Sequence, residues 1–244
     1  MRKKYFYGIM TMFMLVLLFV TVYGYFDSQN TCSEISFNTF QDIDTHSNSD
    51  EVVLSKVEQL QQEYHNSDIK AILSIDNSDF SEIVVQSLDN DYYLTHNYAK
   101  EQAPLGAIFA DYRVQLESEK KVLIYGHSST KGDAPFNYLE EYYDRDFYES
   151  HKYITLETKD NTYQYEIFSV YVETSDFTYM NLFFDNQDDW YSHILKLQSK
   201  SLYAIDTNLT AEDDILILQT CSNHSKYKDY SKKYLLIVSK KVKL

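Results

Sequence analysis

The sequence is poor in glycine and proline, with five glycines and two prolines among 244 residues. The glycines never cluster, which excludes a glycine-rich phosphate-binding loop. Their scarcity, with that of proline, excludes a collagen-like repeat or a proline-rich linker. There is no His-Glu-x-x-His motif and no paired cysteine spacing. We therefore expect neither a metal ion nor another cofactor.

Cysteine and net positive charge are also lacking. Cys32 and Cys221 are the only cysteines, too few for a disulfide framework in an exported domain. They lie near opposite ends of the chain, which disfavours their pairing. The formal net charge of -15 argues against a nucleic-acid partner. With 44% apolar residues, the chain can build a substantial core.

The longest uncharged apolar stretch is residues 5–26. It is long enough to cross the roughly 30 Å hydrocarbon core of a bilayer. No Ala-x-Ala-like cleavage site follows it, although a cleaved signal peptide is the alternative. Basic residues at 2–4 precede the stretch, so the positive-inside rule predicts a cytoplasmic N-terminus at 1–4 and a single-pass anchor. We expect a polar stalk at 27–50 and an extracellular domain at 51–244.

Residues 51–244 alternate short apolar runs with helical patterns. Helices are expected at 50–64 (with Ser49 or Asp50 as N-cap), 135–147 and 188–202. Strands are expected at 69–75, 83–85, 107–112, 121–125, 153–157, 162–173, 215–220 and 234–242. No internal repeat or linker divides this part. The pattern predicts one mostly β domain with peripheral helices, arranged as a barrel.

The stretch Ile215–Cys221 places a thiol at a strand end. Four aliphatic residues predict a buried strand, and Cys221 stands where the strand gives way to a polar run. A nucleophilic thiol needs a base and donors for an oxyanion. Among seven histidines, His127 shares this strand-end context, because it follows residues 121–125 and Gly126. The two strand ends are expected to meet on one rim; a thiol that merely finishes a core strand is the alternative.

Two further features concern charge and the remaining histidines. Residues 222–244 hold seven lysines against one acid, Asp229. Nearby cations lower the pKa of a thiol, although a solvated basic edge strand has the same composition. Four other histidines stand in polar or helical contexts and are expected at the surface: His46, His65, His151 and His193.

Together these segments resemble the sortases, membrane-anchored cysteine transpeptidases of Gram-positive bacteria. Residues 218–221, Leu-Gln-Thr-Cys, resemble their Thr-Leu-x-Thr-Cys signature, and Tyr125-Gly126-His127 resembles the segment that bears their histidine. Class B is indicated by the stretches 85–94, 106–113 and 136–154 and by the helix around Trp190. The resemblance implies a sortase-like closed β-barrel with an N-terminal helix or helices and a long helix inserted between late strands.

The resemblance also implies an activity. Cys221 would attack an Asn-Pro-x-Thr-like sorting signal near the C-terminus of a secreted protein and form a thioacyl-enzyme. An amine of the peptidoglycan precursor would then take the acyl group, with His127 exchanging the protons. The partners would be secreted proteins with sorting signals and the cell-wall amine. A non-catalytic domain that binds sorting signals or wall components and a pilin-polymerising sortase are the alternatives.

The third catalytic residue of the family, an Arg just before the last strand, is missing. No Arg follows Arg145, and Lys233 stands in the expected place, with Lys232 as the alternative. Lys supplies charge and a donor but not the planar fork of guanidinium. Matching by motif predicts substrate contacts at seven positions: Asn90, Leu94, Tyr125, Gln219, Ser175, Tyr179 and Met180.

Overall fold

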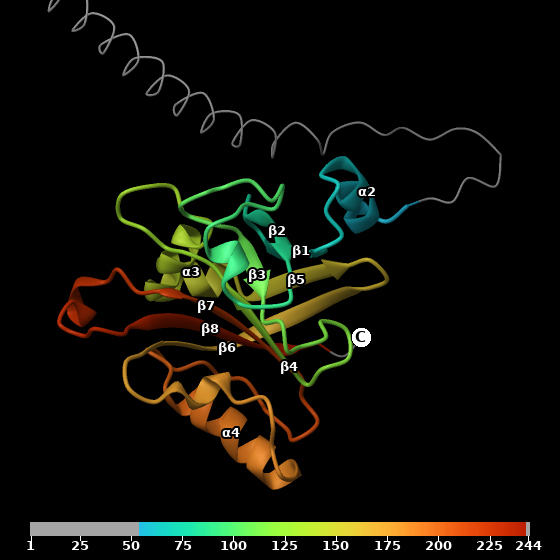
Figure 1. The fold of residues 1–244 in the computed structure, drawn as a ribbon. Helices are drawn as coiled ribbons and strands as arrows, with labels where there is room; N and C mark the ends of the chain where they lie inside the picture. Colours follow the sequence, from blue (N-terminus) through green and yellow to red (C-terminus); the bar gives the residue numbers. More distant parts are fainter. Residues whose placement is uncertain (1–53, 243–244) are drawn as a thin grey trace, which may run out of the picture. The chain divides into compact units, whose positions relative to one another are not determined.

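The computed structural model describes residues 54–242, all of which belong to one compact unit. Its centre is formed by β1 (Ile69–Ile75), β2 (Ser81–Val85), β3 (Ile108–Ala110), β4 (Lys121–Tyr125), β5 (Tyr153–Thr158), β6 (Thr162–Glu173), β7 (Ile215–Cys221) and β8 (Tyr234–Lys241). Around the closed barrel their order is β1-β2-β3-β4-β7-β8-β6-β5, with β5 paired back to β1 (Figure 1). The β2–β3 and β4–β7 pairs are parallel. The predicted barrel is confirmed.

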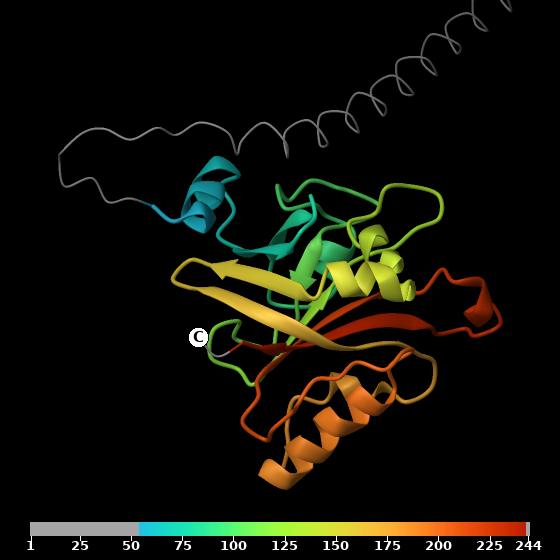
Figure 2. The same cartoon turned by 180° about the vertical axis from the view of Figure 1, so that it is seen from behind.

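The helices lie around this barrel. They are α2 (Lys56–Glu63), α3 (Arg145–Ser150) and α4 (Gln187–Ser199), with short 3-10 turns η1 (Tyr92–Leu94), η2 (Asn137–Tyr143), η3 (Phe177–Met180) and η4 (Ser225–Tyr227). In Figure 1 α4 lies below the barrel, and Figure 2 shows it from behind on the same side, away from α2 and α3. The predicted N-terminal helix and the helix inserted between β6 and β7 are therefore both present.

Strand β7 is buried on both faces, which explains its continuous aliphatic run. Leu216 and Leu218 pack in the core inside the barrel. Ile215 and Ile217 pack in a second core outside it, together with Trp190 of α4. Because successive side chains of a strand point to opposite faces, a strand between two cores must be apolar at every position.

The predicted helix at 135–147 is wrong as a single helix. Residues 137–143 form η2, Asp144 is extended, and α3 begins at Arg145. The Asp144 carboxylate accepts a hydrogen bond from the Asp146 backbone N–H at 2.9 Å, which makes it a new N-cap. With about three residues per turn in a 3-10 helix, Tyr142 turns into the core beside Leu139. In an α-helix the residue four positions after Leu139, Tyr143, would occupy this core position instead.

Helix α2 starts later than predicted. Ser55 is its N-cap, and its hydroxyl accepts from the Glu58 backbone N–H at 3.2 Å. The Glu58 carboxylate accepts in return from the Ser55 backbone N–H at 3.0 Å. This reciprocal capping box fixes the start at Lys56, whereas Ser49 and Asp50 lie outside the described residues.

Several expectations fall on the N-terminal part that the structure does not describe. The anchor at 5–26, the stalk at 27–50 and Cys32 are among them. Within residues 54–242, no helix combines the length and hydropathy needed to cross a bilayer.

Candidate active site

The carboxyl ends of β4 and β7 lie at the same rim of the barrel. These strands pair in parallel, with Tyr125 opposite Gln219. The Gly126 backbone N–H donates to the Gln219 carbonyl at 3.2 Å, which continues the ladder by one residue. His127 and Cys221 each follow two residues after the Tyr125–Gln219 pair, so the structure brings them to one end of the barrel. A thiol and an imidazole so placed are the groups needed for acyl transfer through a thioester.

Cys221 is the last residue of β7, and its side chain is exposed. Protein atoms around the sulfur nevertheless withhold water from it, and this desolvation raises the pKa of the Cys221 thiol. The charge of Lys233 lowers that pKa, and the charge of Glu140 raises it. The net direction is upward, so the thiol is protonated at neutral pH and must lose its proton to a base before it attacks.

His127 is held by a backbone carbonyl. Its Nε2 lies 3.0 Å from the Leu94 carbonyl oxygen. A carbonyl only accepts hydrogen bonds, so Nε2 carries the hydrogen and Nδ1 is the nitrogen that can take a proton. The preceding Gly126 is required by close packing, since a Cβ there would lie 2.6 Å from the Phe136 ring. The Phe136 backbone N–H also donates to the His127 carbonyl at 2.9 Å.

The structure distinguishes the two lysines that precede β8. The Lys233 carbonyl accepts from the Ser222 backbone N–H at 2.9 Å, and the charge of this lysine acts on the Cys221 thiol. Lys232 instead lies over the Phe177 ring, 5.5 Å from its centroid. Three other C-terminal lysines contact groups away from the thiol: Lys226 with Tyr227, Lys240 with Asn208 and Lys241 with Tyr163. One residue of the basic segment therefore favours the thiolate, and burial outweighs it.

The sequence patterns did not identify Glu140, which belongs to η2. Its carboxylate accepts from the Asn223 backbone N–H at 2.9 Å, and burial raises its pKa. One helical turn further, the Tyr143 hydroxyl lies 2.6 Å from the Ser222 hydroxyl. Both contacts join η2 to the segment after Cys221. They connect residues far apart in sequence, so no local pattern could have revealed them.

Two of the predicted substrate contacts lie together beside β7. The Tyr179 hydroxyl donates to the Gln219 side-chain oxygen at 2.7 Å. Tyr179 is buried, and burial raises the pKa of its hydroxyl, with further contributions from Tyr234, Glu173 and Cys221. Segment η3 is therefore seated against the strand that carries the thiol.

Two other predicted contacts share a buried carboxylate that sequence patterns also missed. Asp111 is fully buried and accepts from the Tyr125 hydroxyl at 2.8 Å and from the Asn90 amide at 3.2 Å. The Arg113 guanidinium donates to both Asp111 oxygens, at 2.8 and 2.7 Å. The Asn90 oxygen accepts in turn from the Tyr112 backbone N–H. Asn90 and Tyr125 are thus fixed by the protein, while Leu94 contributes its carbonyl to His127.

The loop before η3 carries the candidate Ser175, whereas the last candidate, Met180, is the final residue of η3; both side chains are exposed. The first turn of this loop is anchored by the Glu173 carboxylate, which accepts from three successive backbone N–H groups, those of residues 174–176. Lys200 at the end of α4 pairs with both Glu173 and Asp176. The loop is therefore tied to α4 at its base and exposed further along.

Comparison with known proteins agrees with this fold. The model of the Sortase domain family matches residues 83–241. Sortase B of Listeria monocytogenes is 36% identical over 178 residues, which cover 72% of this chain and 71% of that protein. Sortase B of Staphylococcus aureus is 30% identical over 180 residues, with coverages of 73% and 72%. The chain therefore belongs to the sortase family as a sortase B homologue, and it is a cysteine transpeptidase.

Solved structures of sortase B are similar throughout the barrel. Sortase B from Bacillus anthracis in complex with AAEK2 superposes with a TM-score of 0.72 at 31% identity, covering 90% of this chain and 98% of that one. Sortase B of Clostridium perfringens gives a TM-score of 0.68 at 28% identity, with coverages of 76% and 99%. The expected class of fold and enzyme is thus confirmed.

Proposed function

We propose that this enzyme cleaves an Asn-Pro-x-Thr-like sorting signal of secreted proteins and joins them to an amine of the peptidoglycan precursor. Cys221 is the proposed nucleophile and His127 the proposed acid and base. The observation that carries the proposal is the parallel β4–β7 pairing, which brings both residues to one rim. The charge of Lys233 acts on the same thiol.

The chemistry follows from the geometry of the two groups. Nδ1 of His127 accepts the thiol proton as the Cys221 sulfur attacks the carbonyl carbon of the Thr. The peptide C–N bond then breaks, and the imidazolium returns the proton to the leaving amine. The incoming amine attacks the thioester carbonyl, gives its proton to His127 and displaces the sulfur. Lys233 stabilises the oxyanion by charge and one donor at a time, since it lacks the guanidinium fork.

The proposed substrate groove runs over the loop before η3 and along the rim. Ser175 and Met180 are exposed and free to contact a peptide. Gln219 and Tyr179 form its wall through their mutual hydrogen bond. Asn90, Leu94 and Tyr125 line it on the β4 side, where Asp111 holds the first and third in place.

The proposed location of the enzyme follows from its N-terminal sequence. Residues 5–26 form a single membrane anchor, residues 1–4 stay in the cytoplasm and the catalytic domain is extracellular. There it meets its two partners, the secreted protein with its C-terminal signal and the precursor amine. The support is the uncharged stretch preceded by basic residues.

The deciding experiment is capture of the thioacyl-enzyme. The protein is incubated with fluorogenic Asn-Pro-x-Thr peptides and with matched peptides in which Ala replaces the Pro, and intact mass is recorded. We expect cleavage and an acyl adduct on Cys221, both absent in Cys221→Ala. Cleavage of the Ala peptides at equal rate would show that the Pro is not read. Full cleavage by Cys221→Ala would end the proposal.

A further inference from the structure

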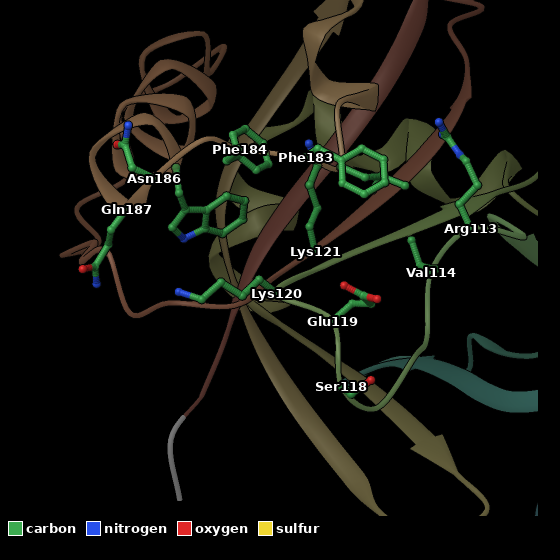
Figure 3. A pocket seen from close by; sticks show the side chains of 12 residues that line it. Arg113, Val114, Ser118, Glu119, Lys120, Lys121, Phe183, Phe184, Asn186 and Gln187 are labelled. Atoms are coloured by element: carbon green, nitrogen blue, oxygen red, sulfur yellow. The ribbon is translucent and has the colours of Figure 1, made fainter.

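A pocket lies at the end of β4 opposite to His127. Its volume is about 520 Å³, within the usual range for small-molecule sites. The segments that line it are the β3–β4 loop, the start of β4 and the stretch that leads into α4 (Figure 3). Lys121 and His127 are six steps apart along nearly extended chain, about 20 Å at 3.3 Å per step. The pocket is therefore separate from the transpeptidase site.

The unusual group in this pocket is Lys121, the first residue of β4. Its side chain is only 3% exposed. The ammonium donates to the Asn181 carbonyl at 2.8 Å and to Nε2 of His193 at 2.9 Å. No ion pair recorded for residues 54–242 includes Lys121. A buried cation without a counter-charge is costly, and one of its three donors is left for another acceptor.

The protein neighbours of Lys121 do not compensate its charge. Since Nε2 of His193 accepts from an ammonium, this imidazole is neutral; burial, with the charge of Lys121, lowers its pKa to about 3. His193 is therefore buried, and the prediction that it lies at the surface is wrong. Burial, with the charge of Arg113, lowers the pKa of Lys121 to about 7. An anion placed beside Lys121 would remove this penalty.

The other lining groups restrict the kind of anion. Arg113 is already neutralised by Asp111, and Lys120 is directed toward the Ala211 carbonyl and the Trp190 ring. Glu119 also lines the pocket and repels negative charge, and this repulsion grows with the charge of the ligand. The site therefore suits a monoanion with a single charged group.

The remaining wall is aromatic. Lys121 lies 5.6 Å from the centroid of the Phe184 ring, and in Figure 3 it points toward the side lined by Phe183 and Phe184. Phe183 is 88% exposed, so this large apolar ring gains from contact with a ligand. Trp190, the only tryptophan of the chain, completes this side.

We propose that this pocket binds an organic monoanion, a carboxylate carried on an apolar body. The carboxylate accepts from the free donor of Lys121, and the body packs against Phe183 and Phe184. This chemistry is shared by a free organic acid and by the carboxylate at the end of a peptide. The proposal is independent of the transpeptidase reaction.

Trp190 provides the readout, because its fluorescence reports on this pocket alone. The full chain is titrated with 4-phenylbutanoate, with the neutral 4-phenylbutanamide, and with a short peptide that ends in a phenylalanine carboxylate, and calorimetry gives the affinities. We expect the acid to bind roughly tenfold more tightly than the amide, or more, because charged hydrogen bonds have this magnitude. Comparison of the acid with the peptide shows which source the pocket accepts.

Three variants test the residues. Lys121→Met should abolish the preference for acid over amide, whereas Lys120→Met, the matched control, should change it less than about threefold. Phe183→Ala, at an exposed position that does not endanger folding, should weaken acid and amide equally. If Lys121→Met does not fold, as circular dichroism would show, the acid–amide comparison in the unmodified protein decides. Equal affinities for acid and amide, no binding of either acid, or a folded Lys121→Met that keeps the preference would overturn the proposal.

Discussion

The two ends of the β4–β7 pair hold ionisable side chains in opposite electrostatic settings. At the carboxyl end, burial raises the pKa of the Cys221 thiol while Lys233 lowers it. At the amino end, burial lowers the pKa of Lys121 to about 7, and the charge of Arg113 adds to the effect. Burial favours the neutral form at both ends. At the rim the positive charge of Lys233 opposes the effect of burial on the thiol. At the amino end the positive charge of Arg113 adds to the effect of burial on Lys121.

This difference separates a thiol that is placed to react from an ammonium that is buried without a counter-charge. The thiol is exposed, it lies at the same rim as His127, and the charge of Lys233 acts on it, so it is placed to exchange a proton. The ammonium of Lys121 is buried, and no ion pair among residues 54–242 includes it. Four changes would break or sharpen this contrast.

The largest effect is expected from the loss of the base at the rim. His127→Ala should slow peptide cleavage by about 10²–10⁴-fold, since a positioned general acid and base contributes that much. The measurement is kcat/KM on the fluorogenic peptide. His224→Ala is the matched control, because its Nδ1 accepts from the Lys226 backbone N–H. Equal losses in both variants would show that the parallel pairing does not select the base.

The next effect concerns the cation at the rim. Lys233→Ala should lower kcat by roughly 10–10²-fold, since loss of one oxyanion donor can cost this much or more. Lys233→Arg should keep or raise kcat, because guanidinium brings two donors in one plane. Lys232→Ala, whose ammonium lies over Phe177, should cost less than about threefold. A larger loss for Lys232→Ala than for Lys233→Ala would reassign the role.

At the far end we expect a pH effect on stability. Lys121 titrates near pH 7 in the folded protein and at about 10.4 when unfolded. Between these values the unfolded chain binds more protons, so this group makes the free energy of unfolding rise with pH. His193, with a pKa of about 3, stays neutral throughout this range.

Chemical denaturation at pH 7, 8 and 9 measures this slope. Relative to Lys121→Met, the unmodified protein should gain roughly 1 kcal/mol of stability per pH unit. Lys120→Met should behave as the unmodified protein does. Parallel curves for the unmodified protein and Lys121→Met would show that Lys121 carries no buried penalty.

The smallest effect is a shift in the pH profile of thiol alkylation by iodoacetamide. Lys233→Gln removes the charge that lowers the Cys221 pKa, so its profile should move to higher pH. Glu140→Gln removes the charge that raises it, so its profile should move to lower pH. Shifts in the same direction would contradict the opposed charges at the rim.

Local sequence patterns predicted the barrel well because its strands lie between two cores. Residues 121–125 and 162–173 have the same bounds in prediction and structure, and 215–220 differs by one residue. Their continuous or alternating apolar runs directly record which faces are covered. The sequence also predicted that the strand ends before Cys221 and His127 meet at one rim, because each combines a strand end with a reactive side chain.

The predictions that failed concern segments where two local structures compete, or residues whose partners lie far away in the sequence. At 135–147 an α-helical spacing was present, but residues 137–143 form a 3-10 helix with Tyr142 in the core, and the Asp144 cap starts a separate helix. Glu140 binds a backbone N–H far along the chain, and Asp111 binds the Tyr125 hydroxyl on the neighbouring strand, so their roles appear only in three dimensions. The burial of His193 was missed because its partner, Lys121, belongs to a distant strand.

The pairing of β4 with β7 also dictates when the enzyme can become active. Lys121 pairs with Ile215, so much of the chain must be in place before these strands meet. Contacts of such long sequence separation slow the folding of a domain. Until β7 pairs with β4, the proposed nucleophile Cys221 and the proposed base His127 are not held at one rim. The proposed activity therefore requires a closed barrel, and an incompletely folded chain cannot form the thioester with a peptide.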